Sequence, residues 1–142
     1  SNLNLDGKTI TLRGIVDRID ELDGCLRIID YKTGKVSNNE LEVYDWENII
    51  LDYKKFSKAF QILMYAYILN KESMLPNNTT AGIISFKNLT SWVMLFAEKD
   101  GARSRSKNQL ITQEVLNKFE IQLQTLLKEI FNLEIPFTEK EI

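Results

Sequence analysis

Residues 14–35 read GIVDRIDELDGCLRIIDYKTGK, and this stretch decides the fold. Two runs rich in apolar and β-branched residues, 8–20 and 25–32, flank the tight-turn sequence Glu21-Leu22-Asp23-Gly24. This pattern predicts a β-hairpin. Apolar residues occupy both parities of the first run, so we expect it to be a central strand that is buried on both faces.

Outside the hairpin, the apolar periodicity predicts a helix over about 46–71, with a possible break near 51–55. Its expected inward stripe is Ile49, Tyr53, Phe56, Phe60, Leu63 and Tyr67. Two strands are expected near 79–87 and 91–98, and a last helix over about 113–132, capped by Thr112. The order β-β-α-β-β-α predicts an α/β fold, a mixed sheet flanked by helices, in a single domain spanning 1–142.

The amino-acid composition limits the kinds of catalysis that are open to this chain. The chain has no histidine and one cysteine, Cys25. This excludes His-based nucleophilic catalysis, His-ligated metals, thiolate clusters and internal disulfides. Carboxylates, lysines, tyrosines and a hard metal ion remain as the means of catalysis. No apolar run is long enough to cross a bilayer, so we expect a cytoplasmic protein with no membrane partner.

Asp17, Asp30 and Lys32 form the candidate catalytic group. Asp30 and Lys32 are two residues apart in an expected strand, so their side chains share a face. A turn centred at residues 22–23 would place Asp17 beside residue 28, on the diagonal to Asp30. Two carboxylates and the Tyr31 carbonyl suit a hard cation such as Mg²⁺, and Lys32 would stabilise developing negative charge.

The alternative interpretation is a solvated surface pair, because Asp-x-Lys is common in exposed strands. Context weighs against it. Asp17 follows Val16, and Asp30 follows Ile28-Ile29. A carboxylate in an apolar strand has to be paired or ligated, since burying a bare charge is costly.

Three strings, GIVDRID, IIDYKTGK and QILMY (61–65), closely resemble the PD-(D/E)xK nuclease superfamily. The RecB-type and AddB-type nuclease domains of helicase–nucleases and the CRISPR adaptation nucleases are the most similar members. The resemblance implies a restriction-endonuclease-like αβββαβ core. It also implies that Asp17 and Asp30 bind metal, that Lys32 is catalytic, and that Gln61 and Tyr65 support the site and contact DNA.

The resemblance further implies a Mg²⁺-dependent (or Mn²⁺-dependent) deoxyribonuclease, exonuclease-like, acting in DNA repair and recombination. Its expected partners are DNA and a helicase domain or subunit of a larger protein. Family members usually carry a further Glu or His on a helix upstream of the first strand, and only about seven residues precede that strand here. We therefore expect a C-terminal fragment with a truncated N-terminal helix. A non-catalytic domain that binds DNA or a partner is the alternative.

Basic and aromatic residues elsewhere are weaker candidates. The loop residues Arg103, Arg105 and Lys107 are candidate phosphate contacts, although charged loops are usually just solvated. Trp46 and Trp92 could stack on bases, but packing in the core or an interface is the favoured interpretation. A further basic edge ahead of Gln61 is formed by Lys54, Lys55 and Lys58.

Overall fold

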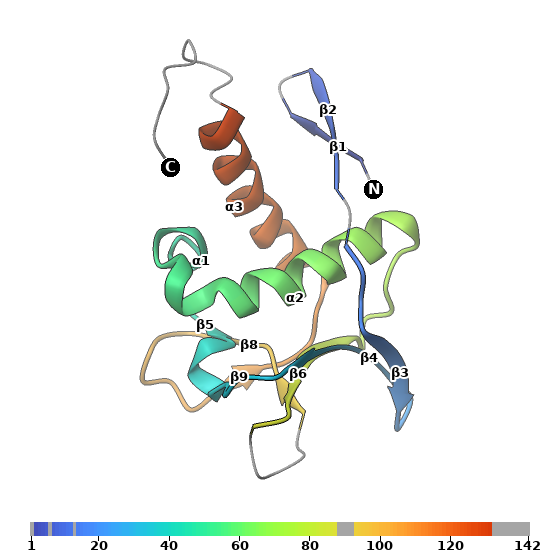
Figure 1. The fold of residues 1–142 in the computed structure, drawn as a ribbon, viewed down its shortest axis with the longest axis vertical. Coiled ribbons are helices and arrows are strands. Elements are labelled where there is room, and N and C mark those ends of the chain that lie inside the picture. The colour runs from blue at the N-terminus through green and yellow to red at the C-terminus, as the bar shows by residue number, and fades with distance from the viewer. Residues whose placement is uncertain (1, 6, 13, 88–92, 132–142) are drawn as a thin grey trace.

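A computed structural model describes residues 2–5, 7–12, 14–87 and 93–131. Figure 1 shows the arrangement of the elements. The strands and helices are, in chain order, β1 (Asn2–Leu5), β2 (Lys8–Thr11), β3 (Arg18–Leu22), β4 (Cys25–Lys32), the short 3₁₀ turn η1 (Asn38–Glu40), β5 (Glu42–Val43), α1 (Asn48–Leu51), α2 (Tyr53–Glu72), β6 (Thr80–Ser85), β7 (Met94–Leu95), β8 (Ala97–Lys99), β9 (Lys107–Asn108) and α3 (Gln113–Phe131).

The main sheet has the strand order β3-β4-β6-β7. β3 and β4 pair antiparallel, β4 and β6 pair parallel, and β6 and β7 pair antiparallel. The parallel pair requires a crossover, and α1 and α2 supply it. The predicted fold class, a mixed sheet flanked by helices, is therefore confirmed. A smaller sheet has the order β5-β8-β9, and β1 pairs with β2 in a separate hairpin.

The β3–β4 hairpin turns on Asp23 and Gly24, which have positive φ angles of 53° and 80°. Two consecutive residues with positive φ match the twist of the flanking strands. The pairing runs from Leu22 opposite Cys25 to Arg18 opposite Ile29. The expected turn centre was thus wrong by one residue, and this register, continued by one position, places Asp17 level with Asp30 rather than with residue 28. The face is unchanged because the shift is an even number of residues.

The expectation of one central strand over residues 8–20 was wrong. Residues 8–11 form β2, which pairs with β1, while β3 begins only at Arg18 and lies at the edge of the main sheet. Ile19 is accordingly 49% exposed. Among the described residues no helix precedes β3, and the β1–β2 hairpin occupies that part of the chain.

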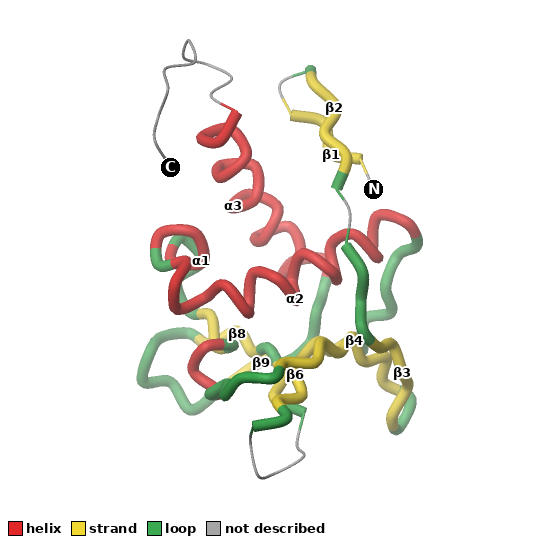
Figure 2. Tube along the Cα trace, in the orientation of Figure 1, coloured by secondary structure: helices red, strands yellow, loops and turns green. Residues whose placement is uncertain are grey.

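Helix α2 lies between the main sheet and α3, as Figures 1 and 2 show. The backbone breaks at Asp52, within the expected interval, and separates α1 from α2. The Thr112 hydroxyl accepts a hydrogen bond from the Val115 N–H at 3.2 Å, which confirms the predicted cap of α3. No helix in the described part of the chain is long and apolar enough to cross a membrane.

The centre of the helical layer is aromatic. Phe119 of α3 is fully buried, and its ring lies 5.3 Å from that of Phe60 and 5.9 Å from that of Tyr67, both on α2. Tyr53 was expected on the same inward stripe, but it is 52% exposed. It begins α2 directly after the break at Asp52, and its ring packs against that of Phe60.

Candidate functional site

The sheet brings the two predicted carboxylates together. Asp30 lies in the buried middle of β4 and is only 4% exposed. Asp17 precedes β3, and its Oδ2 accepts a hydrogen bond from the Tyr31 N–H at 2.8 Å. The β3–β4 register, continued by one position, sets Asp17 opposite Asp30, and each carboxyl group shifts the pKa of the other. Both carboxyl groups therefore face one side of the sheet, close enough to share a cation.

The two carboxyl groups differ in acidity. Burial raises the pKa of Asp30 above its ordinary value, against the opposing effect of the Lys32 ammonium, and Asp17 adds to the rise. The hydrogen bond from the Tyr31 N–H lowers the pKa of Asp17, and its bond to Asp30 lowers it further. The pKa of Asp30 thus lies above that of Asp17.

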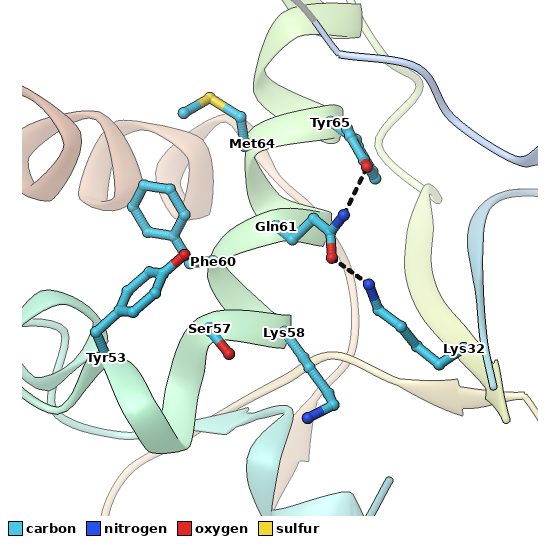
Figure 3. A pocket seen from close by; sticks show the side chains of 8 residues that line it. All are labelled: Lys32, Tyr53, Ser57, Lys58, Phe60, Gln61, Met64 and Tyr65. Carbon is cyan, nitrogen blue, oxygen red and sulfur yellow. Dashed lines mark hydrogen bonds between the residues drawn. The ribbon is translucent and has the colours of Figure 1, made fainter. Parts of the chain in front are cut away.

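Lys32 links this pair to helix α2. Its Nζ lies 2.9 Å from Asp30 Oδ2 and donates to Gln61 Oε1 at 2.5 Å. The Gln61 amide nitrogen in turn donates to the Tyr65 hydroxyl at 2.7 Å. Figure 3 shows this chain of contacts, with Lys32 reaching from the strand toward the helix. Gln61 and Tyr65 are four residues apart, so one helical face presents both, as the sequence predicts.

The donor set fits a hard divalent cation. No donor in the described part of the chain reaches the buried Asp30 Oδ2 with hydrogen-bond geometry, although Lys32 is at ion-pair distance. The C=O of Tyr31 points to the same edge of β4 as its N–H, beyond the last paired residue of β3. Carboxylate and carbonyl oxygens are the ligands that Mg²⁺ prefers. The described residues hold no cluster of three or more His, Cys, Asp and Glu side chains suited to a metal.

A third acid in the hairpin, Asp20, has a different role. Its carboxylate makes two contacts with Arg27, at 2.7 and 2.8 Å, and an ion pair with Arg18 at 2.7 Å. The hydrogen bond from Arg27 lowers the pKa of Asp20 despite its partial burial. Asp20 thus stays ionised and paired with the two arginines, and it is not part of the Asp17–Asp30 pair.

The predicted basic loop lies on the other sheet. Arg103 and Arg105 are exposed between β8 and β9. Lys107 is in β9, and its ammonium forms an ion pair with Glu42 at 2.6 Å. None of the three lines the pocket beside Lys32. The structure therefore brings Asp17, Asp30, Lys32, Gln61 and Tyr65 together, and leaves these three residues apart from them.

Trp46 packs against the core, as the favoured interpretation of the sequence predicts. The Trp46 indole N–H donates to Glu98 at 2.8 Å, and its ring lies 6.1 Å from that of Phe96. It is half-buried against the core. Trp92 lies outside the described residues.

An open pocket of about 630 Å³ adjoins Lys32, Gln61 and Tyr65. Its other lining residues come from the same face of α2: Tyr53, Ser57, Lys58, Phe60 and Met64. Figure 3 shows these side chains along the helix. Apart from Lys58, sequence reasoning did not single them out as functional, because Tyr53 and Phe60 were counted in the core stripe. The spacing 53, 57, 60/61, 64/65 is itself a helical face and could have indicated them.

The structure also explains Gly14. A Cβ at this position would lie 2.9 Å from Tyr65 Cδ1 and 3.3 Å from Ile68 Cδ1. The backbone that leads to Asp17 thus packs directly on the ring of Tyr65. Gly14 lets the two parts of the site approach each other.

Comparison with known proteins agrees with this geometry. The profile of the PD-(D/E)XK nuclease superfamily matches residues 2–141. An ATP-dependent helicase/deoxyribonuclease subunit from Pediococcus pentosaceus is 32% identical over 134 residues, which cover 88% of this chain. The chain spans about a tenth of that relative's length. No solved structure matched the chain.

Proposed function

Because the chain belongs to the PD-(D/E)XK nuclease superfamily, we propose that it hydrolyses DNA phosphodiester bonds at the Asp17–Asp30–Lys32 cluster, with Mg²⁺ or Mn²⁺ as cofactor. The observation that carries the proposal is the contact between two carboxyl groups, one of them buried, with a lysine from the same strand beside them. Two neighbouring carboxyl groups, one of them buried, form an environment in which a cation is favourable, because it offsets both the burial and the repulsion of their charges.

In this proposal each residue has a defined task. Asp17, Asp30 and the Tyr31 carbonyl would hold the cation, which supplies Lewis-acid chemistry and lowers the pKa of a bound water. Lys32 would place its ammonium against the negative charge that develops on the phosphate. Gln61, which accepts from Lys32, orients that ammonium, and Tyr65 orients Gln61. The side chains that support catalysis thus come from α2, and the ligands come from β4 and from the segment before β3.

The wider setting is also a proposal. The relative from Pediococcus pentosaceus is named a helicase/deoxyribonuclease subunit, and this chain corresponds to a small part of it. We infer that the chain is the nuclease part of a larger cytoplasmic helicase–nuclease that acts on DNA ends in repair and recombination, with exonuclease-like cleavage. The helicase domain or subunit would deliver the strand to the site. The exposed Arg103 and Arg105, together with Lys107, would contact DNA outside the pocket.

One observation favours a second candidate function, a domain of the same fold that binds DNA or a partner without cutting. The described residues supply two clustered carboxylates and no third acidic ligand. Against it, a non-catalytic domain has no need to keep Asp17, Asp30 and Lys32 together, since Asp30 is a buried charge with a folding cost.

The deciding experiment measures degradation of labelled single-stranded DNA with and without Mg²⁺ or Mn²⁺. Asp30→Ala and Lys32→Ala should each lower the cleavage rate roughly 100-fold or more. Asp30 would hold the cation and Lys32 would face the negative charge that develops on the phosphate, so each substitution removes a group that stabilises the transition state. Glu21→Ala, an exposed carboxylate on β3 of the same hairpin, is the matched control and should leave the rate unchanged. Equal rates for the wild type and the two site variants would refute the enzymatic proposal.

A further inference from the structure

The pocket beside Lys32 extends well past the proposed catalytic cluster. It follows one face of α2 from Tyr65 back to Tyr53, which is twelve residues, or roughly 18 Å along the helix axis. Gln61 and Tyr53 are separated by roughly 12 Å on the same estimate. A group that binds at the Tyr53 end would thus belong to the substrate chain next to the reacting phosphate, and not to the reacting phosphate itself.

Tyr53 is an exposed aromatic residue whose ring is held in place by aromatic side chains that reach the core. Its ring meets Phe60 edge-on, with centroids 5.8 Å apart and planes at 69°. Phe60 in turn packs edge-on against the fully buried Phe119. The Tyr53 ring is thus anchored to the core while half of it faces solvent. A rigid, exposed ring loses little conformational entropy when a ligand stacks on it.

The polar groups of the pocket suit a phosphodiester chain. Lys32 and Lys58 line it, together with the Ser57 hydroxyl. Lys58 is held at 3.2 Å from Glu40, so part of its charge is already balanced. Phe60 and Met64 make the rest of the wall apolar. Aromatic and apolar surface combined with ammonium groups is the chemistry that binds unpaired nucleotides.

We propose that Tyr53, supported by Phe60, forms a base-stacking subsite for an unpaired nucleotide that flanks the cleaved phosphodiester. The proposal rests on the proposed function, because it identifies the pocket with the path of the DNA strand. It assigns to Tyr53 a substrate-positioning role. The stacked base has to be unpaired, since a base within a duplex has no free face for the ring.

The test measures binding apart from cleavage. Fluorescence anisotropy in EDTA would compare a short labelled oligothymidylate with an abasic oligonucleotide of the same length. Tyr53→Ala should weaken oligothymidylate binding by about 5- to 160-fold, the range expected for loss of one stacked base. Tyr53→Phe keeps the ring and should bind within about twofold of the wild type. The abasic oligonucleotide should bind the wild type and Tyr53→Ala equally.

Phe131→Ala provides the matched control. Phe131 is 49% exposed, close to the 52% of Tyr53, but it lies at the end of α3 and does not line the pocket. This variant should bind both oligonucleotides as the wild type does. Equal oligothymidylate binding by Tyr53→Ala and the wild type would overturn the subsite, and so would an equal loss for the abasic oligonucleotide. If Tyr53→Ala fails to fold, Tyr53→Leu, which keeps an apolar side chain beside Phe60, replaces it in the same comparison and should show the same base-dependent loss.

The two proposals fail separately. If the wild type cleaves DNA in Mg²⁺ but the Tyr53 comparison shows no base-dependent loss, the subsite is wrong and the nuclease assignment stands. If the Tyr53 comparison holds and no metal stimulates cleavage, the pocket binds single strands in a protein that does not cut them.

Discussion

Asp30 combines a functional position with an energetic cost. It lies in the middle of the sheet with 4% of its surface exposed, and Lys32 is its ion-pair partner at 2.9 Å. Burial is the largest influence on its acidity, and it raises the pKa of the carboxyl group despite that partner. A charge kept in a site that disfavours it is typical of functional residues, because a fold selected for stability alone would replace it.

We predict that Asp30→Asn stabilises the protein while it removes metal binding. A pKa raised in the folded state means that ionised Asp30 opposes folding. The gain is therefore largest above the raised pKa, shrinks as pH falls through it, and disappears only below the ordinary value of 3.8, where Asp30 is protonated in both states. We expect the melting temperature at neutral pH to rise by about 2–4 °C.

Thermal unfolding of both proteins across a pH series without metal checks this prediction. Lys32 keeps Gln61 as a partner in the variant and still reaches solvent, so it is not left as an unpaired buried charge. A variant that is less stable than the wild type at neutral pH would show that the ion pair with Lys32 outweighs the burial of Asp30.

At the scale of elements, the site depends on how closely the segment before β3 approaches α2. Gly14 lies on the ring of Tyr65, and Asp17 follows three residues later. Tyr65 holds Gln61, and Gln61 holds Lys32. Asp17 is thus coupled to the supporting residues of α2 through the contact between the Gly14 backbone and the Tyr65 ring.

Gly14→Ala should disturb this contact. The new Cβ would lie 2.9 Å from an atom of the Tyr65 ring, so the ring or the backbone has to move. We expect a loss of about 1–3 kcal/mol in the free energy of unfolding, as for overpacking elsewhere. Denaturant titration measures this loss. The cleavage assay should show a lower rate, because Gln61 loses its hydrogen bond to the Tyr65 hydroxyl.

Gly34→Ala is the control for this variant. A Cβ at Gly34 meets nothing within 4 Å, although the residue also lies close to the site in sequence, two positions after Lys32. It should change neither stability nor cleavage appreciably. Equal effects of the two substitutions would mean that the packing of Gly14 on Tyr65 has no special role.

At the scale of the whole molecule, the described residues build an incomplete ligand set. Strand β4 supplies Asp30 and the Tyr31 carbonyl, the segment before β3 supplies Asp17, and helix α2 supplies Gln61 and Tyr65 as supporting groups. Two carboxylates hold a divalent ion weakly, because affinity rises with the number of charged ligands. In the described part of the chain no other acidic or cysteine side chain completes the group.

We therefore predict that this chain by itself binds Mg²⁺ with a dissociation constant weaker than about 1 mM. Isothermal titration calorimetry measures it directly, with Asp30→Asn as the non-binding reference. Affinity should fall further as pH drops through the raised pKa of Asp30, because protons compete with the metal. Micromolar affinity would contradict the prediction and would mean that further ligands complete the site.

The fold class, the hairpin, the two long helices and the break near residue 52 could all be predicted from the sequence. These features depend on local signals: turn residues, apolar periodicity and capping groups act over a few residues. The division of residues 8–20 into two strands was not predicted, because the pattern of apolar residues does not say which segment they pack against. Tyr53 was misplaced for the same reason, since a helical stripe does not say which of its residues the rest of the fold covers.

The amino-acid sequence by itself determined the chemistry that is open to this protein. The absence of histidine and the single cysteine leave carboxylates, lysines, tyrosines and a hard ion as the means of catalysis, and the spacing of Asp30 and Lys32 places them on one face of a strand. Only the tertiary structure decided that Asp17 comes level with Asp30, that Lys32 meets Gln61, and that Tyr53 stays at the surface. Register, burial and the approach of helix to sheet are set by contacts between distant segments, which no local pattern encodes.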